Sequence, residues 1–225
     1  MILTSTKEYS HAEYPTLPEL TQTNIGGKRH YLTPDGAFIS ITSLLSSQVP
    51  DSIRSWRESV GNDVADYVMR TAARRGTRVH KLVELALKNK PLGDITDYGV
   101  LSFALFNMMQ PALDKIEQIK ALEQPLYNAE LGVAGTADTI CSYDGIPSVV
   151  DYKTASKIRE DVERHMIQGA FYASAWTWQT KMPIDQVVII MVAEDGRMQV
   201  FKDKPSAHLD KIRELTDDLI RLKNL

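Results

Sequence analysis

The chain has 225 residues, of which 43% are hydrophobic and 24% are charged, and its formal net charge is −3. A chain of this length can bury one sizeable core, so we expect an N-terminal arm over residues 1–30 and a single domain over residues 31–225. The slightly acidic balance argues against a protein that coats nucleic acid, and any contact with nucleic acid would require a local basic surface.

The sequence has few features that indicate a cellular compartment. The N-terminus has no cationic start followed by an apolar stretch, and no apolar run is long enough to cross a membrane. The one cysteine, Cys141, excludes internal disulfides and is typical of an intracellular protein. We therefore expect a soluble, cytoplasmic protein with no membrane partner.

The first part of the chain carries turn and capping signals. Residues 1–30 are polar and interrupted by prolines and glycines, which indicates an irregular arm or loosely packed strands. Residues 31–41 contain Pro34-Asp35-Gly36 and are typical of a hairpin that leads to a helix start at Ser40 and Thr42. These side chains can cap the helix, and the free N–H groups at a helix start can bind phosphate, so both roles stay open.

Apolar residues at helical spacing predict helices over residues 52–88 and 96–120. Arg75-Gly76-Thr77 is expected to interrupt the first helix, with Thr77 as a cap for the part that follows. Pro111 is expected to break or kink the second helix. The methionines of this second helix are more typical of a core than of a ligand site.

The rest of the chain alternates strand and helix patterns. We expect a strand over residues 122–130, two antiparallel strands within 132–154 joined at Asp144-Gly145, a helix over 159–180, strands over 187–192 and 198–201, and a closing helix over 206–222. This order of elements predicts an α/β fold with a central mixed β-sheet flanked by α-helices. Glu123 and Glu130, on or beside the first of these strands, are acids whose orientation the sequence leaves open.

The two strands within residues 132–154 carry a group of charged side chains, Asp138 on the first strand and Asp151 and Lys153 on the second. Because residues two apart on a strand share a face, Asp151 and Lys153 should point the same way, while Tyr152 points into the packing. Two carboxylates can hold a hard cation such as Mg²⁺, and a nearby lysine can orient or deprotonate a water molecule. An ordinary surface ion pair would also explain the two neighbouring charges.

Four separated blocks of the chain together resemble the PD-(D/E)XK nuclease superfamily. The blocks are Ser40-Ile41-Thr42-Ser43-Leu44-Leu45, Arg75-Gly76-Thr77-Arg78-Val79-His80 with Glu84, the hairpin that carries Asp138, Asp151 and Lys153, and Gln168-x-x-x-Tyr172. The likeness is to the RecB-like branch, which includes mitochondrial genome maintenance exonuclease and many phage exonucleases. Ala137-Asp138 replaces the Pro-Asp of the superfamily pattern, a proline that is commonly missing in this branch.

The resemblance implies a restriction-endonuclease-like fold and a set of site residues. The implied metal ligands are His80, Asp138, Asp151 and the backbone carbonyl of Tyr152. The implied catalytic side chains are Asp138, Asp151, Lys153 and Gln168. Mg²⁺ is the expected cofactor, with Mn²⁺ as a substitute, and a single cysteine excludes the four-cysteine iron–sulfur cluster of some relatives. Glu84 is expected to be an outer partner of the site or an exposed helix charge.

The resemblance also implies a substrate, which is DNA with single-stranded or frayed ends. The expected nucleic-acid contacts are Ser40, Thr42, Trp56, Arg75, Gln168 and Tyr172. A channel or arch over residues 31–75, with Trp56 or Tyr67 stacking on bases, would admit only ends. We expect a metal-dependent exonuclease in phage or bacterial DNA replication, recombination or repair, with replication or recombination proteins as partners.

Two alternatives stay open at this point. A catalytically inactive module of the same fold would bind DNA or a replication protein without cutting. A metal-dependent nuclease that acts on RNA would use the same residues. Cleavage assays on DNA and RNA, compared with binding assays, separate the three hypotheses.

Overall fold

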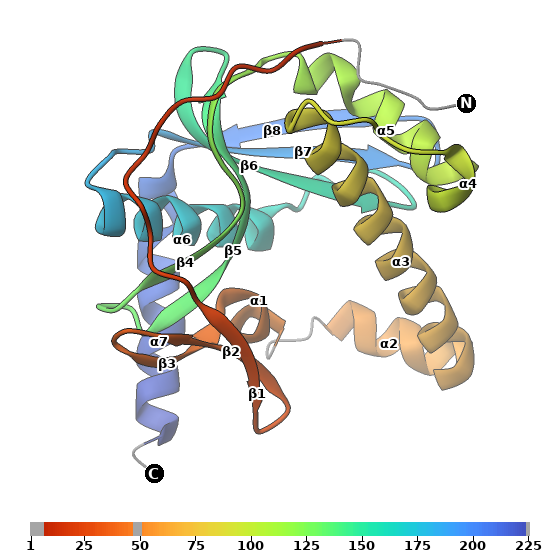
Figure 1. Cartoon of the computed structure of the whole chain (residues 1–225). Helices are drawn as coiled ribbons and strands as arrows, with labels where there is room; N and C mark the ends of the chain where they lie inside the picture. Colours follow the sequence, from red (N-terminus) through yellow and green to blue (C-terminus); the bar gives the residue numbers. More distant parts are fainter. Residues whose placement is uncertain (1–6, 47–50, 224–225) are drawn as a thin grey trace.

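Eight strands form one sheet in this computed structural model, which describes residues 7–46 and 51–223 (Figure 1). The strands are β1 (Thr21–Ile25), β2 (Lys28–Thr33), β3 (Gly36–Ser40), β4 (Ile116–Asn128), β5 (Val133–Tyr143), β6 (Ile146–Ala155), β7 (Gln186–Ala193) and β8 (Met198–Asp203). The helices are α1 (Ile41–Ser46), α2 (Asp51–Val60), α3 (Asn62–Leu87), α4 (Ile95–Tyr98), α5 (Val100–Leu113), α6 (Glu163–Thr180) and α7 (Leu209–Lys223), with a 3₁₀ turn at Pro205–His208.

Strand β5 lies at the middle of the sheet. It pairs with β4 along one edge, and along its other edge first with β3 and then with β6. The β3–β5 and β6–β7 pairs are parallel and the other pairs are antiparallel. The predicted fold class, α/β with a central mixed sheet flanked by helices, is therefore confirmed.

Helices cover both faces of the sheet and divide the core in two. Helices α3 and α5 pack on one face, and α1, α6 and α7 pack on the other (Figure 1). Neighbouring residues of β6 enter opposite cores, since Val150 joins the α3/α5 core and Val149 joins the α6 core. Burial of each such aliphatic side chain contributes about 1.5–3 kcal/mol, which fixes the register of the strand.

The first predicted helix differs from the observed ones in where it breaks. Helix α3 runs without interruption through Arg75-Gly76-Thr77, and the break lies instead at Gly61, whose φ is 84°. Thr77 donates from Oγ1 to the carbonyl of Ala73 at 3.0 Å, as a threonine inside a helix does, so it is not a cap. One glycine costs a helix only about 1 kcal/mol, and the buried side chains of the following turns outweigh this cost.

The second predicted helix is also wrong in its extent. Gly99, with a φ of 80°, separates α4 from α5, and α5 continues two residues past Pro111 to end at Leu113. Residues up to 120 were expected to be helical, but Ile116 already begins β4. Ile116 and Ile119 have helical spacing, yet both fill the core under α3 and α5 from a strand, because tertiary packing overrides the local pattern.

The other predicted elements are confirmed with small changes at their ends. The Asp144-Gly145 turn joins β5 to β6, and both of its residues have positive φ, 51° and 79°. At the N-terminus, β1 and β2 form a hairpin around Gly26-Gly27, so the expected arm boundary at residue 30 falls inside β2. None of the helices in residues 7–46 and 51–223 combines the length and apolar character that a membrane span needs.

Two glycines inside helices allow a direct test of this packing. A Cβ on Gly169 of α6 would lie 2.3 Å from Cγ1 of Val187 on β7, whereas a Cβ on Gly76 of α3 would lie 3.6 Å from Oγ1 of Thr154, an ordinary contact. We expect Gly169→Ala to lower the free energy of unfolding by about 1–3 kcal/mol and Gly76→Ala to raise it by about 0.5–1 kcal/mol. Urea unfolding of both variants checks this, and a change of the same sign in both would contradict it.

Candidate metal centre

Three side chains that can bind a metal ion meet where α3 crosses the sheet. They are His80 of α3, Glu123 of β4 and Asp138 of β5, and one ligand atom of each lies within 4.8 Å of the other two. Nδ1 of His80 lies 3.4 Å from Oδ2 of Asp138. His80 and Glu123 also line an open crevice of about 470 Å³, together with Gly76, Thr77, Lys81 and Glu84. His80 and Glu123 therefore face a space that can admit an ion, and the ligand atom of Asp138 lies within 4.8 Å of theirs.

His80 is oriented by the backbone of β6. Its Nε2 lies 2.7 Å from the carbonyl oxygen of Tyr152, and because a carbonyl can only accept, Nε2 carries the hydrogen. Nδ1, the other ring nitrogen, lies on the side of Asp138. A histidine that binds metal commonly donates its other N–H to a backbone carbonyl in this way. The carbonyl of Tyr152, a predicted metal ligand, is thus already an acceptor for His80, and its contact with an ion stays a prediction.

Glu123 is the residue of the cluster whose orientation the sequence did not fix. Leu122 pairs with Thr139 and Gln124 with Ala137, so Glu123 stands directly across from Asp138. Its φ is 50°, a left-handed backbone that is uncommon for a glutamate and costs on the order of 1–3 kcal/mol. This irregular residue in β4 places the glutamate beside His80 and Asp138.

The pKa values of Glu123 and Asp138 are both raised. Desolvation and the neighbouring charge of Asp138 raise the pKa of Glu123 to about 7, although the residue as a whole remains exposed at the surface. Burial raises the pKa of Asp138, a shift that His80 opposes and Asp151 increases. Oδ2 of Asp138 accepts a 3.2 Å hydrogen bond from the backbone N–H of Tyr152. A divalent cation would relieve the repulsion between these acids.

Buried Asp151 and partly buried Lys153 form an ion pair next to this cluster. Nζ of Lys153 lies 2.6 Å from Oδ2 of Asp151, which confirms that the two side chains share a face, and Asp151 is 1% exposed. The alternative of an ordinary surface ion pair is therefore wrong. Tyr152 between them lies in the α3/α5 core, as predicted. Burial opposes the charge of Lys153, but the attraction of Asp151 and Asp138 outweighs it and raises the pKa of Lys153. A charged lysine can donate to a water or a phosphate oxygen.

Gln168 and Tyr172 lie on the α6 side of the sheet. Nε2 of Gln168 donates to the hydroxyl of Tyr172 at 3.0 Å. The ring of Tyr172 is 2% exposed and packs against Gly135, where a Cβ would lie only 2.8 Å from the ring. A buried ring cannot stack on a base, so the visible role of Tyr172 is to hold the amide of Gln168 in place.

The remaining predicted contacts with nucleic acid are spread around the centre. Ser40 is buried and its Oγ accepts from the backbone N–H of Ser43 at 3.0 Å, so it serves as a helix cap. Thr42 is exposed and lines a second cavity of about 370 Å³ that Gln168 also lines. Arg75 forms an ion pair with Glu194 at the end of β7, and Trp56 is half-buried on α2.

Glu84 lies at the wall of the same crevice and is paired along its own helix. Its carboxylate forms ion pairs with Lys81 at 2.8 Å and Lys88 at 2.6 Å, both along the same helix. It also lines the crevice of His80 and Glu123. The two lysines hold the glutamate on α3 and lower its pKa against the effect of burial.

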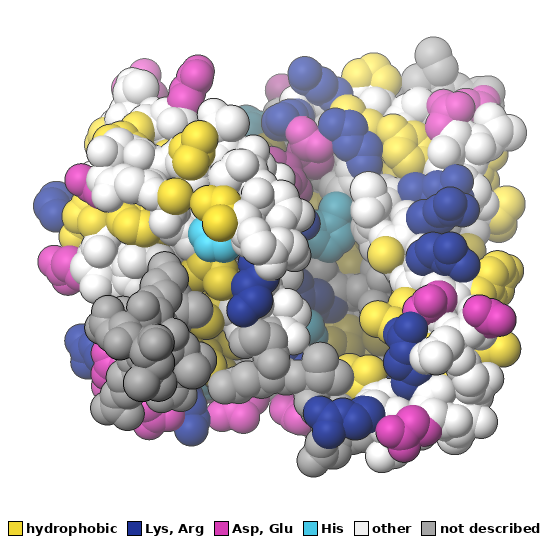
Figure 2. All heavy atoms as spheres, turned by 90° about the horizontal axis from the view of Figure 1, so that it is seen from below, with side chains coloured by type: hydrophobic (Ala, Val, Ile, Leu, Met, Phe, Trp, Pro, Cys, Tyr) yellow, Lys and Arg dark blue, Asp and Glu magenta, His cyan; other side chains and the backbone are white. Residues whose placement is uncertain are grey.

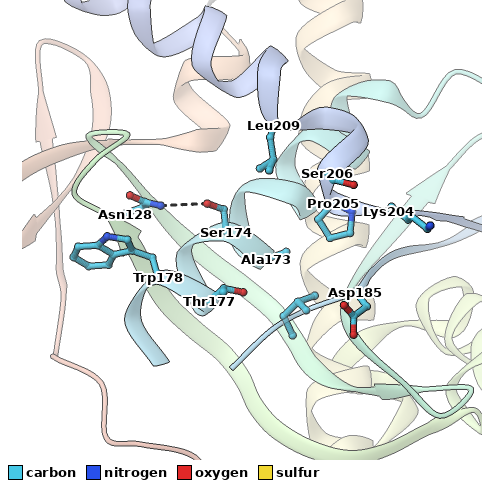
Figure 3. Close-up of a pocket in the computed structure, with 11 residues that line it drawn as sticks. Asn128, Ala173, Ser174, Thr177, Trp178, Asp185, Lys204, Pro205, Ser206 and Leu209 are labelled. Atoms are coloured by element: carbon cyan, nitrogen blue, oxygen red, sulfur yellow. Dashed lines mark hydrogen bonds between the residues drawn. The ribbon is translucent and has the colours of Figure 1, made fainter. Parts of the chain in front are cut away.

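A larger cavity, of about 710 Å³, lies away from the metal centre (Figure 3). It is bordered by α6 and by the segment that leads from β8 into α7, and Figure 3 shows Nδ2 of Asn128 donating to Oγ of Ser174 on its wall, at 3.2 Å. Trp178 and Lys204 also line it. The cavity shares no lining residue with the metal centre.

No protein-family model and no curated protein sequence matches the chain. Among solved structures, a protein named "Putative exonuclease" from Eubacterium rectale is 14% identical over 68% of each chain, with a TM-score of 0.49. A protein named SSO0001 is 16% identical over 64% of this chain and 74% of its own, with a TM-score of 0.33.

Proposed function

We propose that this chain is a divalent-metal-dependent DNA exonuclease of the PD-(D/E)XK type, similar to the RecB-like branch. The observation that carries the proposal is the convergence of His80, Glu123 and Asp138 with the buried Asp151–Lys153 pair. A glutamate whose pKa is raised by burial and by a neighbouring aspartate, a histidine whose Nδ1 faces that aspartate, and a lysine held by Asp151 are groups that phosphodiester hydrolysis can use.

The residues of the centre have separate tasks in this proposal. Glu123 and Asp138 would hold Mg²⁺, with Nδ1 of His80 as a nitrogen ligand, and Mn²⁺ would fit the same mixed set of donors. The bound cation would supply positive charge at the phosphoryl oxygen and make a water more acidic.

The neighbouring pair would act on the reacting groups. Asp151 holds Lys153 in one position, and Nζ of Lys153 donates to the attacking water or to a phosphate oxygen. Gln168 is fixed by Tyr172 through its amide nitrogen, and its amide oxygen would accept a hydrogen bond from the water or the strand. We assign DNA ends as the substrate because the sequence resembles end-processing enzymes.

Digestion of end-labelled nucleic acids tests the proposal. We expect the purified protein to shorten linear single-stranded DNA in Mg²⁺ or Mn²⁺, to stop in EDTA, and to act more slowly on RNA of the same sequence. Circular single-stranded DNA should survive, because it has no end. Rapid cutting of the circle would contradict the exonuclease assignment, and binding of DNA without any metal-dependent cutting would contradict the enzyme assignment.

A further inference from the structure

Helix α3 carries a run of positive charge that the metal centre does not use. Between Tyr67 and Lys81 the sequence contains four arginines and ends at a lysine, with no acidic residue. Arg75 is paired with Glu194 and Lys81 with Glu84. Arg78 lies against α5, since a Cβ on Gly99 would come within 3.4 Å of it.

Of the three exposed arginines in this run, the two that do not approach Gly99 are Arg70 and Arg74. Nε of Arg70 donates to the backbone carbonyl of Asp66 at 3.2 Å, and no carboxylate within the described residues forms an ion pair with either arginine. An unpaired guanidinium on a rigid helix is a ready ligand for a phosphate. The two side chains therefore leave local positive charge on a protein whose overall charge is negative.

The exposed arginines lie on the side of α3 that leads to the metal centre. The spacing of three and four residues that defines one helix face connects positions 67, 70, 74, 77 and 81. Thr77 and Lys81, at the end of this series, line the crevice of His80 and Glu123. The opposite side of the helix is buried, with Val79, Leu82, Val83 and Ala86 in the core.

An exposed aromatic residue begins the same face. Tyr67 is 67% exposed, and Val64, Val68 and Met69 beside it are also exposed. Figure 2 shows dark blue basic side chains over α2 and α3, beside a hollow that separates them from the half of the molecule formed by the N-terminal strands. Tyr67 precedes His80 by 13 residues, which is a rise of about 20 Å along the helix.

We propose that this face of α3, defined by Tyr67, Arg70 and Arg74, is a track that guides single-stranded DNA to the metal centre. The arginines bind backbone phosphates, and Tyr67 stacks on a base. A single strand fits better than a duplex because only its bases expose a ring face to an aromatic side chain. At the stacked spacing of 3.4 Å per strand, 20 Å corresponds to about six nucleotides. This inference rests on the proposed function and adds the path of the substrate.

Binding measured without cleavage tests the track. We expect the Arg70→Ala/Arg74→Ala variant, titrated with fluorescent single-stranded DNA in EDTA, to reduce the slope of log K against log salt by about 1.4, because each lost phosphate contact contributes about 0.7. Tyr67→Ala should weaken binding at least about fivefold, while Tyr67→Phe should keep the affinity. The control is Lys211→Ala/Arg213→Ala on α7, which removes two exposed cations of another helix and should change neither quantity.

Cleavage of substrates of different length separates the track from the chemistry. In Mg²⁺, the α3 variants should raise KM for strands longer than about six nucleotides and leave the turnover of a dinucleotide unchanged. Three results would overturn the track. They are an unchanged affinity and salt slope in the α3 variants, no binding of single-stranded DNA by the parent protein, and an equal loss of affinity for duplex DNA in the α3 variants. A parent protein that binds through these residues but never cuts would overturn the proposed catalysis while supporting the track.

Discussion

Replacement of Asp151 by asparagine is expected to lower the rate of metal-dependent DNA cleavage by about a thousandfold or more. Asparagine keeps the shape of the side chain but removes the negative charge that holds Nζ of Lys153 at 2.6 Å. It also removes one of the carboxylates grouped around Asp138. The measurement is the initial rate on end-labelled single-stranded DNA at saturating Mg²⁺. A parental rate in this variant would show that the site assignment is wrong.

Loss of folding must be separated from loss of chemistry in this experiment. The pair is buried, and removing one partner leaves an uncompensated charge that can cost about 3–5 kcal/mol. The double variant Asp151→Asn/Lys153→Met removes both charges, so we expect it to recover most of the free energy of unfolding and none of the activity. Urea unfolding of the single and double variants, measured beside their rates, gives the control. Activity that returned together with stability would indicate a structural pair.

The β5–β6 hairpin and its charged residues could be predicted because local signals decide them. Asp144-Gly145 fixes the turn, and the two-residue repeat then puts Asp151 and Lys153 on one face and Tyr152 on the other. The prediction of a helix break at Gly76 was wrong because a single glycine disfavours a helix only weakly. Whether a helix continues through it depends on packing from Val79 onward, which is a tertiary effect.

The role of Glu123 could not be derived from residue type alone. Acids on strands are common, and its position depends on how β4 pairs with β5. The sequence did contain one indication of its position. Glu123 and Asp138 are equally far in sequence from a point between Glu130 and Leu131, so two antiparallel strands joined by a turn there would place them opposite each other. The left-handed backbone that turns the glutamate toward His80 has no sequence signal that we identify.

Tyr172 illustrates a different limit. The sequence indicated a polar aromatic residue one helical turn from Gln168, and the structure shows the hydrogen bond between them. Its burial depends on Gly135, which lies on strand β5 and leaves room for the ring only because it lacks a side chain. A role that depends on a neighbour so far away in sequence requires the three-dimensional fold.

The second large effect concerns Glu123, and its signature is a change in the pH dependence of metal binding. The pKa of Glu123 is raised from its ordinary value of 4.5 to about 7. Because a protonated carboxyl group cannot ligate a cation, the affinity of the parent protein for Mn²⁺ should rise with pH up to about 7 and then level off. We expect Glu123→Gln to lower the affinity by about tenfold to a hundredfold or more and to weaken this rise, of which Asp138, whose pKa is also raised by burial, keeps a part. Calorimetric titration at several pH values measures both effects.

Stability without metal gives an independent reading of the same residue. A folded-state pKa above the unfolded value means that folding favours protonated Glu123, so the parent protein in EDTA should lose stability as the pH rises from about 4.5 to 7. Glu123→Gln should escape this loss and unfold at an equal or higher temperature at pH values above 7, whereas added Mn²⁺ should stabilise the parent more than the variant. Glu130→Gln, an exposed acid on the same β4–β5 connection, is the matched control. If Glu123 served only the fold, the opposite result would be seen. Glu123→Gln would then be less stable than the parent in EDTA and would bind Mn²⁺ with the affinity of the parent.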